Sequence, residues 1–78
     1  MELHDRNSIA LARTHVGVAL DEAMTDVIRE PLREIIDFLQ EGDIDTSTSL
    51  LDDTMEECFD PFVRNHLHKA YNYLAEIA

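Results

Sequence analysis

The chain has 78 residues, of which 17 are acidic and six are Lys or Arg, so its formal net charge at neutral pH is −11. Nucleic acids and anionic membranes attract positively charged surfaces, and this charge argues against direct binding to either. A domain of this size buries only about 60% of the surface that its unfolded chain exposes. Because there is no Trp and only three Phe and two Tyr, we expect a thin core that a second copy of the chain completes.

The single cysteine, Cys58, cannot form an intrachain disulfide, which favours a reducing compartment and hence the cytoplasm. Residues 1–7 lack the basic start and apolar run of a signal peptide, so we expect a short N-terminal tail. No run approaches the roughly 18 apolar residues of a membrane span. The sequence therefore predicts a soluble cytoplasmic protein with no membrane partner.

The first predicted helix runs from about Ser8 to Arg29, because apolar residues recur there every three or four positions. These residues are Ile9, Ala12, Val16, Leu20 with Ala19, Ala23 and Val27. Asn7 or Ser8 is the expected N-cap. Gly17 weakens the middle of the helix by about 1 kcal/mol relative to Ala. The sequence leaves open whether the helix bends there.

Pro31 lacks a backbone donor and restricts the residue before it, so the first helix is expected to stop or bend at Arg29-Glu30. Since Pro is well tolerated at a first helical position, a second helix is predicted from Pro31 to Gln40. Its apolar face would consist of Leu32, Ile35, Ile36 and Leu39. Gly42 follows at the position of a C-terminal cap.

Residues 42–49 are rich in Asp, Ser and Thr and are predicted to form a loop. The loop resembles the first half of a calcium-binding EF-hand, with Asp43, Asp45 and Ser47 at the first three ligand positions. The second half departs from that pattern, because Thr48 and Thr54 stand where a Gly and a bidentate Glu are required. We therefore expect a linker that binds no metal, with Ser49 capping a third helix from Leu50 to about Asp60.

The last predicted helix runs from Pro61 or Phe62 to the C-terminus and has the most regular pattern of the chain. Its apolar seam steps by four and three residues, as in helices that pack lengthwise against another helix. The seam residues are Val63, Leu67, Ala70, Leu74 and Ile77. The chain as a whole, residues 1–78, is predicted to be a single acidic all-α domain: a small antiparallel bundle of three to four helical segments, completed by dimerisation.

No set of residues predicts a catalytic site or a cofactor. The acidic neighbours of Cys58 raise a thiol's pKa and oppose a nucleophilic role, so a small core residue is expected. His66-Leu67-His68-Lys69-Ala70 faintly resembles the core motif of histidine phosphotransfer domains, with two of its residues changed. That resemblance implies His66 as a phosphoryl carrier and Lys69 as its electrostatic helper. Four late aromatic residues are expected to fill the core around Pro61, namely Phe59, Phe62, Tyr71 and Tyr73. For Tyr71 and Tyr73, which flank the seam, a dimer contact is the alternative.

Charge is the main functional signal, because Glu34 to Val63 holds ten acids and no Lys or Arg. A surface of one sign steers association with a partner of the other sign. We therefore expect a non-enzymatic regulator or inhibitor that engages a basic partner protein, in the manner of inhibitors whose carboxylates stand in for phosphates. The contact residues would be Glu41, Asp43, Asp45, Asp52, Asp53, Glu56 and Glu57. A second hypothesis is a helix-pairing adaptor that acts through the C-terminal seam, and a third is phosphotransfer through His66. The acidity could also be an adaptation for solubility, and the sequence leaves this open.

Overall fold

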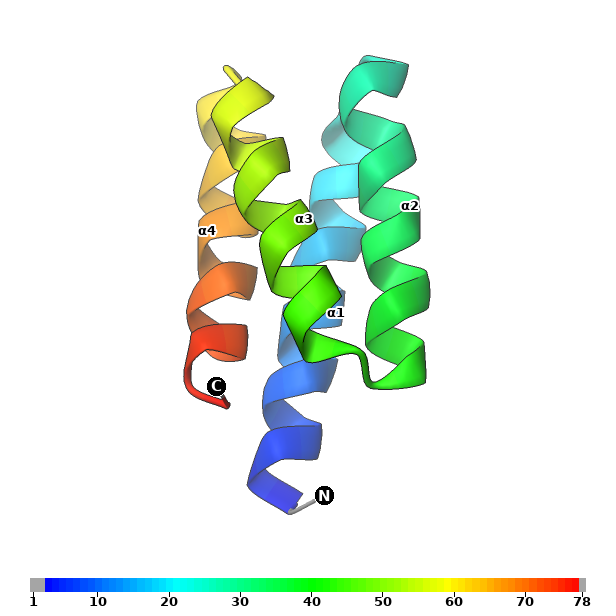
Figure 1. The fold of residues 1–78 in the computed structure, drawn as a ribbon. Helices are drawn as coiled ribbons and strands as arrows, with labels where there is room; N and C mark the ends of the chain where they lie inside the picture. The colour runs from blue at the N-terminus through cyan, green and yellow to red at the C-terminus, as the bar shows by residue number, and fades with distance from the viewer. Residues whose placement is uncertain (1–2, 78) are drawn as a thin grey trace.

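The computed structural model describes residues 3–77, which form four antiparallel α-helices (Figure 1). The helices are α1 (Leu3–Glu22), α2 (Asp26–Glu41), α3 (Ile44–Glu57) and α4 (Pro61–Ala75). Each helix packs against two neighbours in the cyclic order α1, α2, α3, α4, so that α1 lies diagonal to α3 and α2 to α4. The bundle measures 35 × 19 × 19 Å. The prediction of a small all-α antiparallel bundle is confirmed.

The break between the first two helices lies at residues 23–25 and not at Arg29-Glu30. Thr25 adopts an extended conformation before α2, and its carbonyl accepts from the backbone of Ile28 and Arg29. Pro31 lies inside α2, where it removes one intrahelical bond without ending the helix. The buried stripe of α2 is Ile28, Leu32, Ile35 and Leu39. This stripe continues through Pro31, which explains why the helix does too.

Helix α1 begins earlier than predicted and is continuous. Leu3 to Asn7 are helical, so the predicted tail is wrong over these residues, while Met1 and Glu2 lie outside the described part of the chain. The helix also passes through Gly17 without interruption. At the end of α2, Gly42 has the predicted capping role: its φ is 80°, and Gly42 and Asp43 donate to the carbonyls of Leu39 and Phe38. This is a Schellman arrangement, in which Gly avoids the penalty of positive φ.

The predicted 42–49 loop is wrong, because α3 begins at Ile44. Asp43, not Ser49, is its N-cap, and the Asp43 carboxylate accepts from the backbone of Thr46 at 3.1 Å. Ser47 and Thr54 lie on the buried stripe of α3. Their hydroxyls donate to carbonyls four residues back, Asp43 at 2.7 Å and Leu50 at 2.7 Å. The two buried hydroxyl groups are therefore satisfied by the backbone of their own helix. Because residues from Ile44 onward are helical, this segment does not adopt the looped backbone of an EF-hand.

Helix α4 follows the prediction closely. Pro61 occupies its first turn, and the Asp60 carboxylate caps it by accepting from Phe62 at 2.9 Å and Val63 at 3.3 Å. Both features favour a helix that starts at this point. The helix ends at Ala75, so Ile77 lies in the turn that follows.

The core is built from apolar stripes of all four helices. Its buried side chains are Ile9, Ala12, Val16, Ala19, Ala23, Ile28, Leu32, Ile35, Leu39, Leu51, Met55, Cys58, Val63, Leu67, Ala70 and Leu74. Four of the five predicted seam residues are among them, and Ile77 packs against them. The stripes therefore cover one another within a single chain. A dimer would have to form through the exposed apolar side chains instead.

Candidate protein-binding surface

The seven acids predicted to bind a partner fall into two groups along the bundle. Glu41, Asp43 and Asp45 surround the turn from α2 to α3, whereas Asp52, Asp53, Glu56 and Glu57 occupy the opposite half of α3. In Figure 1 the α2–α3 turn, which carries the first group, is at the lower end of the two helices, and the second group belongs to the upper end of α3. They do not form one continuous cluster.

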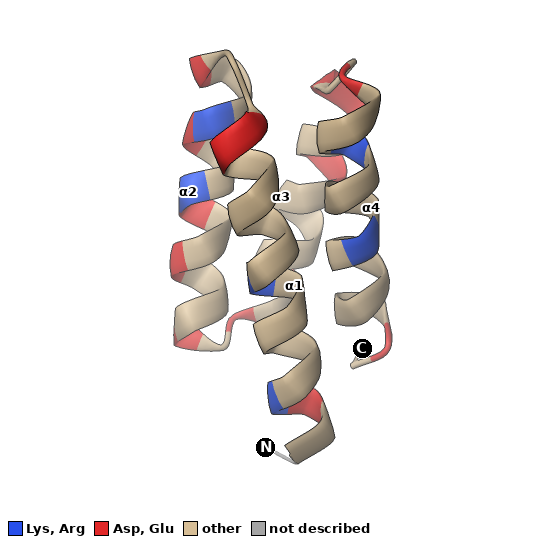
Figure 2. Cartoon of the chain, turned by 180° about the vertical axis from the view of Figure 1, so that it is seen from behind, with Lys and Arg blue, Asp and Glu red and all other residues tan. Residues whose placement is uncertain are grey.

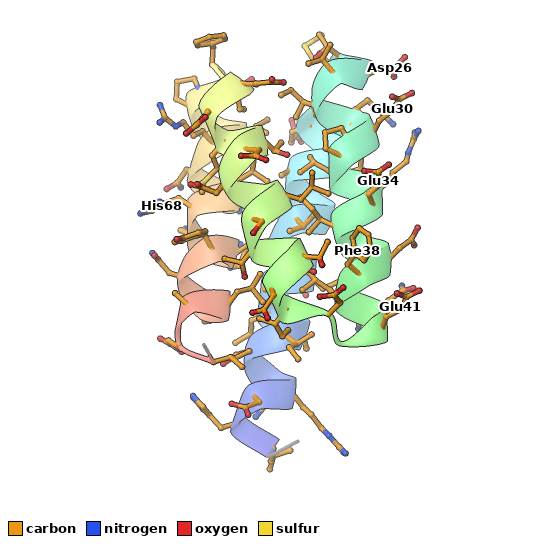
Figure 3. All side chains as sticks on the ribbon, in the orientation of Figure 1. Asp26, Glu30, Glu34, Phe38, Glu41 and His68 are labelled. Carbon is orange, nitrogen blue, oxygen red and sulfur yellow. The ribbon has the colours of Figure 1, made fainter. Side chains whose placement is uncertain are left out.

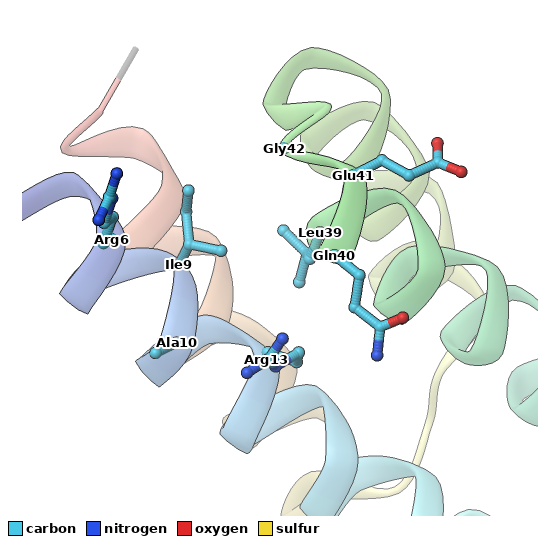
Figure 4. A pocket seen from close by; sticks show the side chains of 8 residues that line it. All are labelled: Arg6, Ile9, Ala10, Arg13, Leu39, Gln40, Glu41 and Gly42. Atoms are coloured by element: carbon cyan, nitrogen blue, oxygen red, sulfur yellow. The ribbon is translucent and has the colours of Figure 1, made fainter. Parts of the chain in front are cut away.

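The group at the α2–α3 turn has a local structural role. Asp43 is half-buried and caps α3, and Asp45 lies in the first turn, where a carboxylate is favoured by the helix dipole. Glu41 lies beside an open groove of about 400 Å³ between α1 and α2, and its carboxylate extends away from α1 (Figure 4). Arg6 and Arg13 line the same groove. This end of the bundle therefore carries charges of both signs.

The group at the end of α3 has no such stabilising role. Asp52, Asp53, Glu56 and Glu57 are all exposed and lie in the last six residues of the helix. Carboxylates are disfavoured at a helix C-terminus, and the pairs Asp52–Glu56 and Asp53–Glu57 are four residues apart, where like charges repel. Over residues 3–77 the only ion-pair contact is between exposed His4 and Glu76, at 4.0 Å. The four carboxylates thus oppose the stability of the helix that carries them.

A second acidic row lies on α2, of which the sequence analysis had singled out only Glu41 as a contact residue and Glu34 as part of the acidic stretch. Asp26, Glu30, Glu34 and Glu41 project along the outer side of α2, beside half-buried Phe38 (Figure 3). The four-residue spacing of the first three acids was visible in the sequence. It was overlooked because the second helix was predicted to begin only at Pro31. Helix α2 also carries Arg29 and Arg33, so its charge is less uniformly negative than that of the end of α3.

Charge differs sharply between the two C-terminal helices. Helix α3 carries five acids and no Lys or Arg, whereas α4 carries Arg64 and Lys69 and no acid. Seen from the back, the basic positions lie on α1, α2 and α4 (Figure 2). His68 projects from the side of α4 away from the acidic row of α2 (Figure 3). The negative field is thus concentrated on the α2–α3 side of the molecule.

The two phenylalanines near Pro61 are not core residues, and the prediction that they fill the core is wrong. Phe59 is 91% exposed and Phe62 is 52% exposed. Phe59 belongs to the short α3–α4 connection, whose direction is set by the cap at Asp60. Tyr71 and Tyr73 are half-buried and pack against the core, as predicted. Cys58 is also buried as predicted, and its Sγ lies 3.8 Å from the carbonyl of Asp60.

His66 lies at the contact between α1 and α4 and is half-buried. Its Nδ1 is 3.0 Å from Nδ1 of His15, so one ring donates and the other accepts. The rings stack at 5.2 Å, while Tyr73 stacks on His15 and Phe62 meets His66 edge-on. Burial lowers the pKa of His15 below its ordinary value of 6.5, and the nearby charges of His66 and Lys69 lower that pKa further. The ring of His66 is thus held by contacts with His15 and Phe62, whereas a phosphoryl carrier has to present its ring freely to solvent.

Within residues 3–77 no group of three or more His, Cys, Asp or Glu side chains is arranged to hold a metal ion. None of the helices over the same residues is both long and apolar enough to cross a membrane. Comparison of the chain with protein-family models, curated proteins and solved structures gave no match.

Proposed function

We propose that the protein is a non-enzymatic regulator or inhibitor that binds a basic surface of another protein. The observation that carries the proposal is the set of four exposed carboxylates, Asp52, Asp53, Glu56 and Glu57, at the end of α3. Their placement lowers the stability of the helix. Residues that cost stability at an exposed site are commonly retained for function.

The acidic row of α2 adds further carboxylates on the neighbouring helix. Successive acids at a spacing of four residues are about 6 Å apart along a helix, which gives a regular line of negative charge. A phosphate backbone presents the same kind of line. We therefore propose a nucleic-acid-handling protein as the partner class, with carboxylates of α2 and α3 in place of phosphates. The single, buried Cys58 supports a cytoplasmic location for this binding.

The test is affinity capture from the native cell extract on the immobilised protein, eluted with a salt gradient. Three forms are compared: the wild type, a quadruple variant with Lys at residues 52, 53, 56 and 57, and a control. The control reverses the charge of Asp5 and Glu76, which lie at the opposite end of the bundle. Circular dichroism shows whether each form is folded.

The wild type and the control should retain the same proteins, and moderate salt should release them because exposed charges are screened. The quadruple variant should retain none of these proteins. A retained partner whose elution does not depend on salt, or that the quadruple variant still binds, contradicts the proposal. The buried seam of α4 gives helix pairing no comparable support, because its residues already pack inside the bundle.

A further inference from the structure

A small apolar groove opens at the end of the bundle where the α1–α2 and α3–α4 connections meet. Both connections lie at the top of Figure 1. The groove has a volume of about 240 Å³ and is lined by residues of both connections and of three helices. Buried Ala23, Ile28, Cys58 and Val63 form its apolar walls. Small-molecule sites usually span roughly 300–1,000 Å³, so this groove suits one large side chain better than a whole ligand.

Two fully exposed apolar side chains line the same groove. Met24 is 92% exposed and Phe59 is 91% exposed, one from each connection. Val27 and Phe62, in the first turns of α2 and α4, add further exposed apolar surface close to them in sequence. A pair of adaptable apolar side chains beside a preformed groove is typical of a protein-binding site.

The charged residues around the groove indicate what occupies it. Glu57 and Asp60 line the groove directly, and Glu56 and Asp26 are close neighbours of its lining residues in the chain. Arg29 is turned inward, where its Nη1 donates to the carbonyl of Ala23 at 3.3 Å. Arg64 does not line this groove but a neighbouring pocket, which it shares with Phe59. Positive charge on the occupant is therefore favoured beside Glu56, Glu57 and Asp60 and disfavoured close to Arg64.

We propose that this groove is a docking site for a basic peptide segment of the partner, with one large apolar side chain inserted between Met24 and Phe59 and with Lys or Arg beside Glu56, Glu57 and Asp60. The proposal rests on the proposed function, because it specifies how the basic partner is held. Charge would bring the segment to the acidic end of α3. The inserted side chain would then add affinity and select segments with a large apolar residue.

The binding test uses a synthetic, fluorescently labelled peptide with Arg on both sides of a central Phe, and a matched peptide in which that Phe is replaced by Gly. Anisotropy titrations measure Kd at low and high salt. Removing the Phe should weaken binding to the wild type about tenfold or more. Phe59→Ser should have a similar effect without unfolding the protein, because the side chain is exposed. Leu3→Ser, at an exposed position of the opposite end, should have none.

Methyl-labelled methionine gives a second measurement by NMR. The signal of exposed Met24 should shift on addition of the Phe peptide, whereas that of buried Met55 should stay unchanged. The groove proposal would be overturned if the two peptides bound equally well and Phe59→Ser did not change their binding. If the quadruple α3 variant nevertheless lost this binding, the proposed role of the acidic surface would still hold. No binding of either peptide at low salt would overturn both proposals. Concentration-dependent dimerisation that Phe59→Ser abolishes, without peptide binding, would show that a second copy occupies the groove.

Discussion

Helices α3 and α4 are adjacent, antiparallel and nearly equal in length, yet they differ in almost every other respect. The buried stripe of α4 is entirely apolar, whereas that of α3 includes Ser47 and Thr54. All the charged side chains of α3 are acidic, and those of α4 are basic. Helix α4 follows the rules of capping and packing, while α3 departs from them at its exposed end. Helix α4 thus mainly holds the bundle together, and the departures of α3 are the basis of the proposal that α3 also serves binding.

The largest effect is expected from removing core side chains of the two helices. Leu67 in α4 and Leu51 in α3 are both fully buried, so Leu67→Ala and Leu51→Ala should each lower the free energy of unfolding by about 2–5 kcal/mol. Urea unfolding followed by far-UV circular dichroism measures the change. Exposed Asn65→Ala is the control. A loss for Leu51→Ala no larger than that of the control would mean that α3 is not part of the core.

Capping should show the next largest effect. Asp60→Ala removes two bonds to the first turn of α4 and should cost about 0.5–2 kcal/mol. Asp43→Ala removes one bond at the start of α3 and should cost no more than that. Ser49→Ala changes only an exposed position inside α3 and should not lower the free energy of unfolding, since Ala has the higher helix propensity. If Ser49→Ala proved costlier than Asp43→Ala in urea unfolding, α3 would begin where the sequence analysis placed it.

Removing single charges from α3 should change the free energy of unfolding by a smaller amount, with opposite signs at the two ends of the helix. Glu56→Gln or Glu57→Gln should raise the free energy of unfolding by on the order of a few tenths of a kcal/mol at low salt, since each removes a negative charge from the negative end of the helix dipole. Asp45→Asn, in the first turn, should lower it by a similar amount. Thermal unfolding at low and high salt tests both. Changes of the same sign at the two ends, or changes that persist at high salt, would exclude this electrostatic explanation.

The smallest effect concerns pH and the α1–α4 contact. The pKa of His15 is lowered in the folded state, so the unfolded chain binds a proton more readily than the folded one. The contribution of His15 to stability is complete above pH 6.5 and decreases as the pH falls from there towards the folded-state pKa. Urea midpoints measured across this range should decrease on acidification. This decrease should be smaller in His15→Gln and unchanged in the control His68→Gln, whose side chain is exposed.

The sequence predicted the fold class and α4 because both depend on regular apolar spacing. It failed at the start of α3, since Ser47 interrupts the apolar pattern there and a buried hydroxyl is not distinguishable from a loop hydroxyl in the sequence. It also misplaced the α1–α2 break, because Pro31 was given more weight than Thr25-Asp26, which form the N-cap and first residue of α2. A single proline in the second turn removes one hydrogen bond and crowds the carbonyl four residues back, and burial of the Ile28 to Leu39 stripe outweighs this cost.

The candidate site was predictable only in part. The acids of α3 were evident from composition, but the exposure of Phe59 was not, because aromatic residues near a bend are usually buried. Exposure here depends on the direction of the α3–α4 connection, which is set by Cys58 pointing inward and by the cap at Asp60. The groove itself combines residues from two connections far apart in the chain. No local pattern predicts such a combination.

The hydroxyls buried on α3 have a further consequence for how the helices are aligned. Buried polar groups that bond across an interface select one alignment of the two helices, because sliding by a turn would leave them unpaired. Ser47 and Thr54 bond to their own helix instead, so they move with it and penalise no particular alignment. The position of α3 along its neighbours is therefore fixed by the shapes of its apolar side chains, Ile44, Leu50, Leu51 and Met55, and by the short connections at either end.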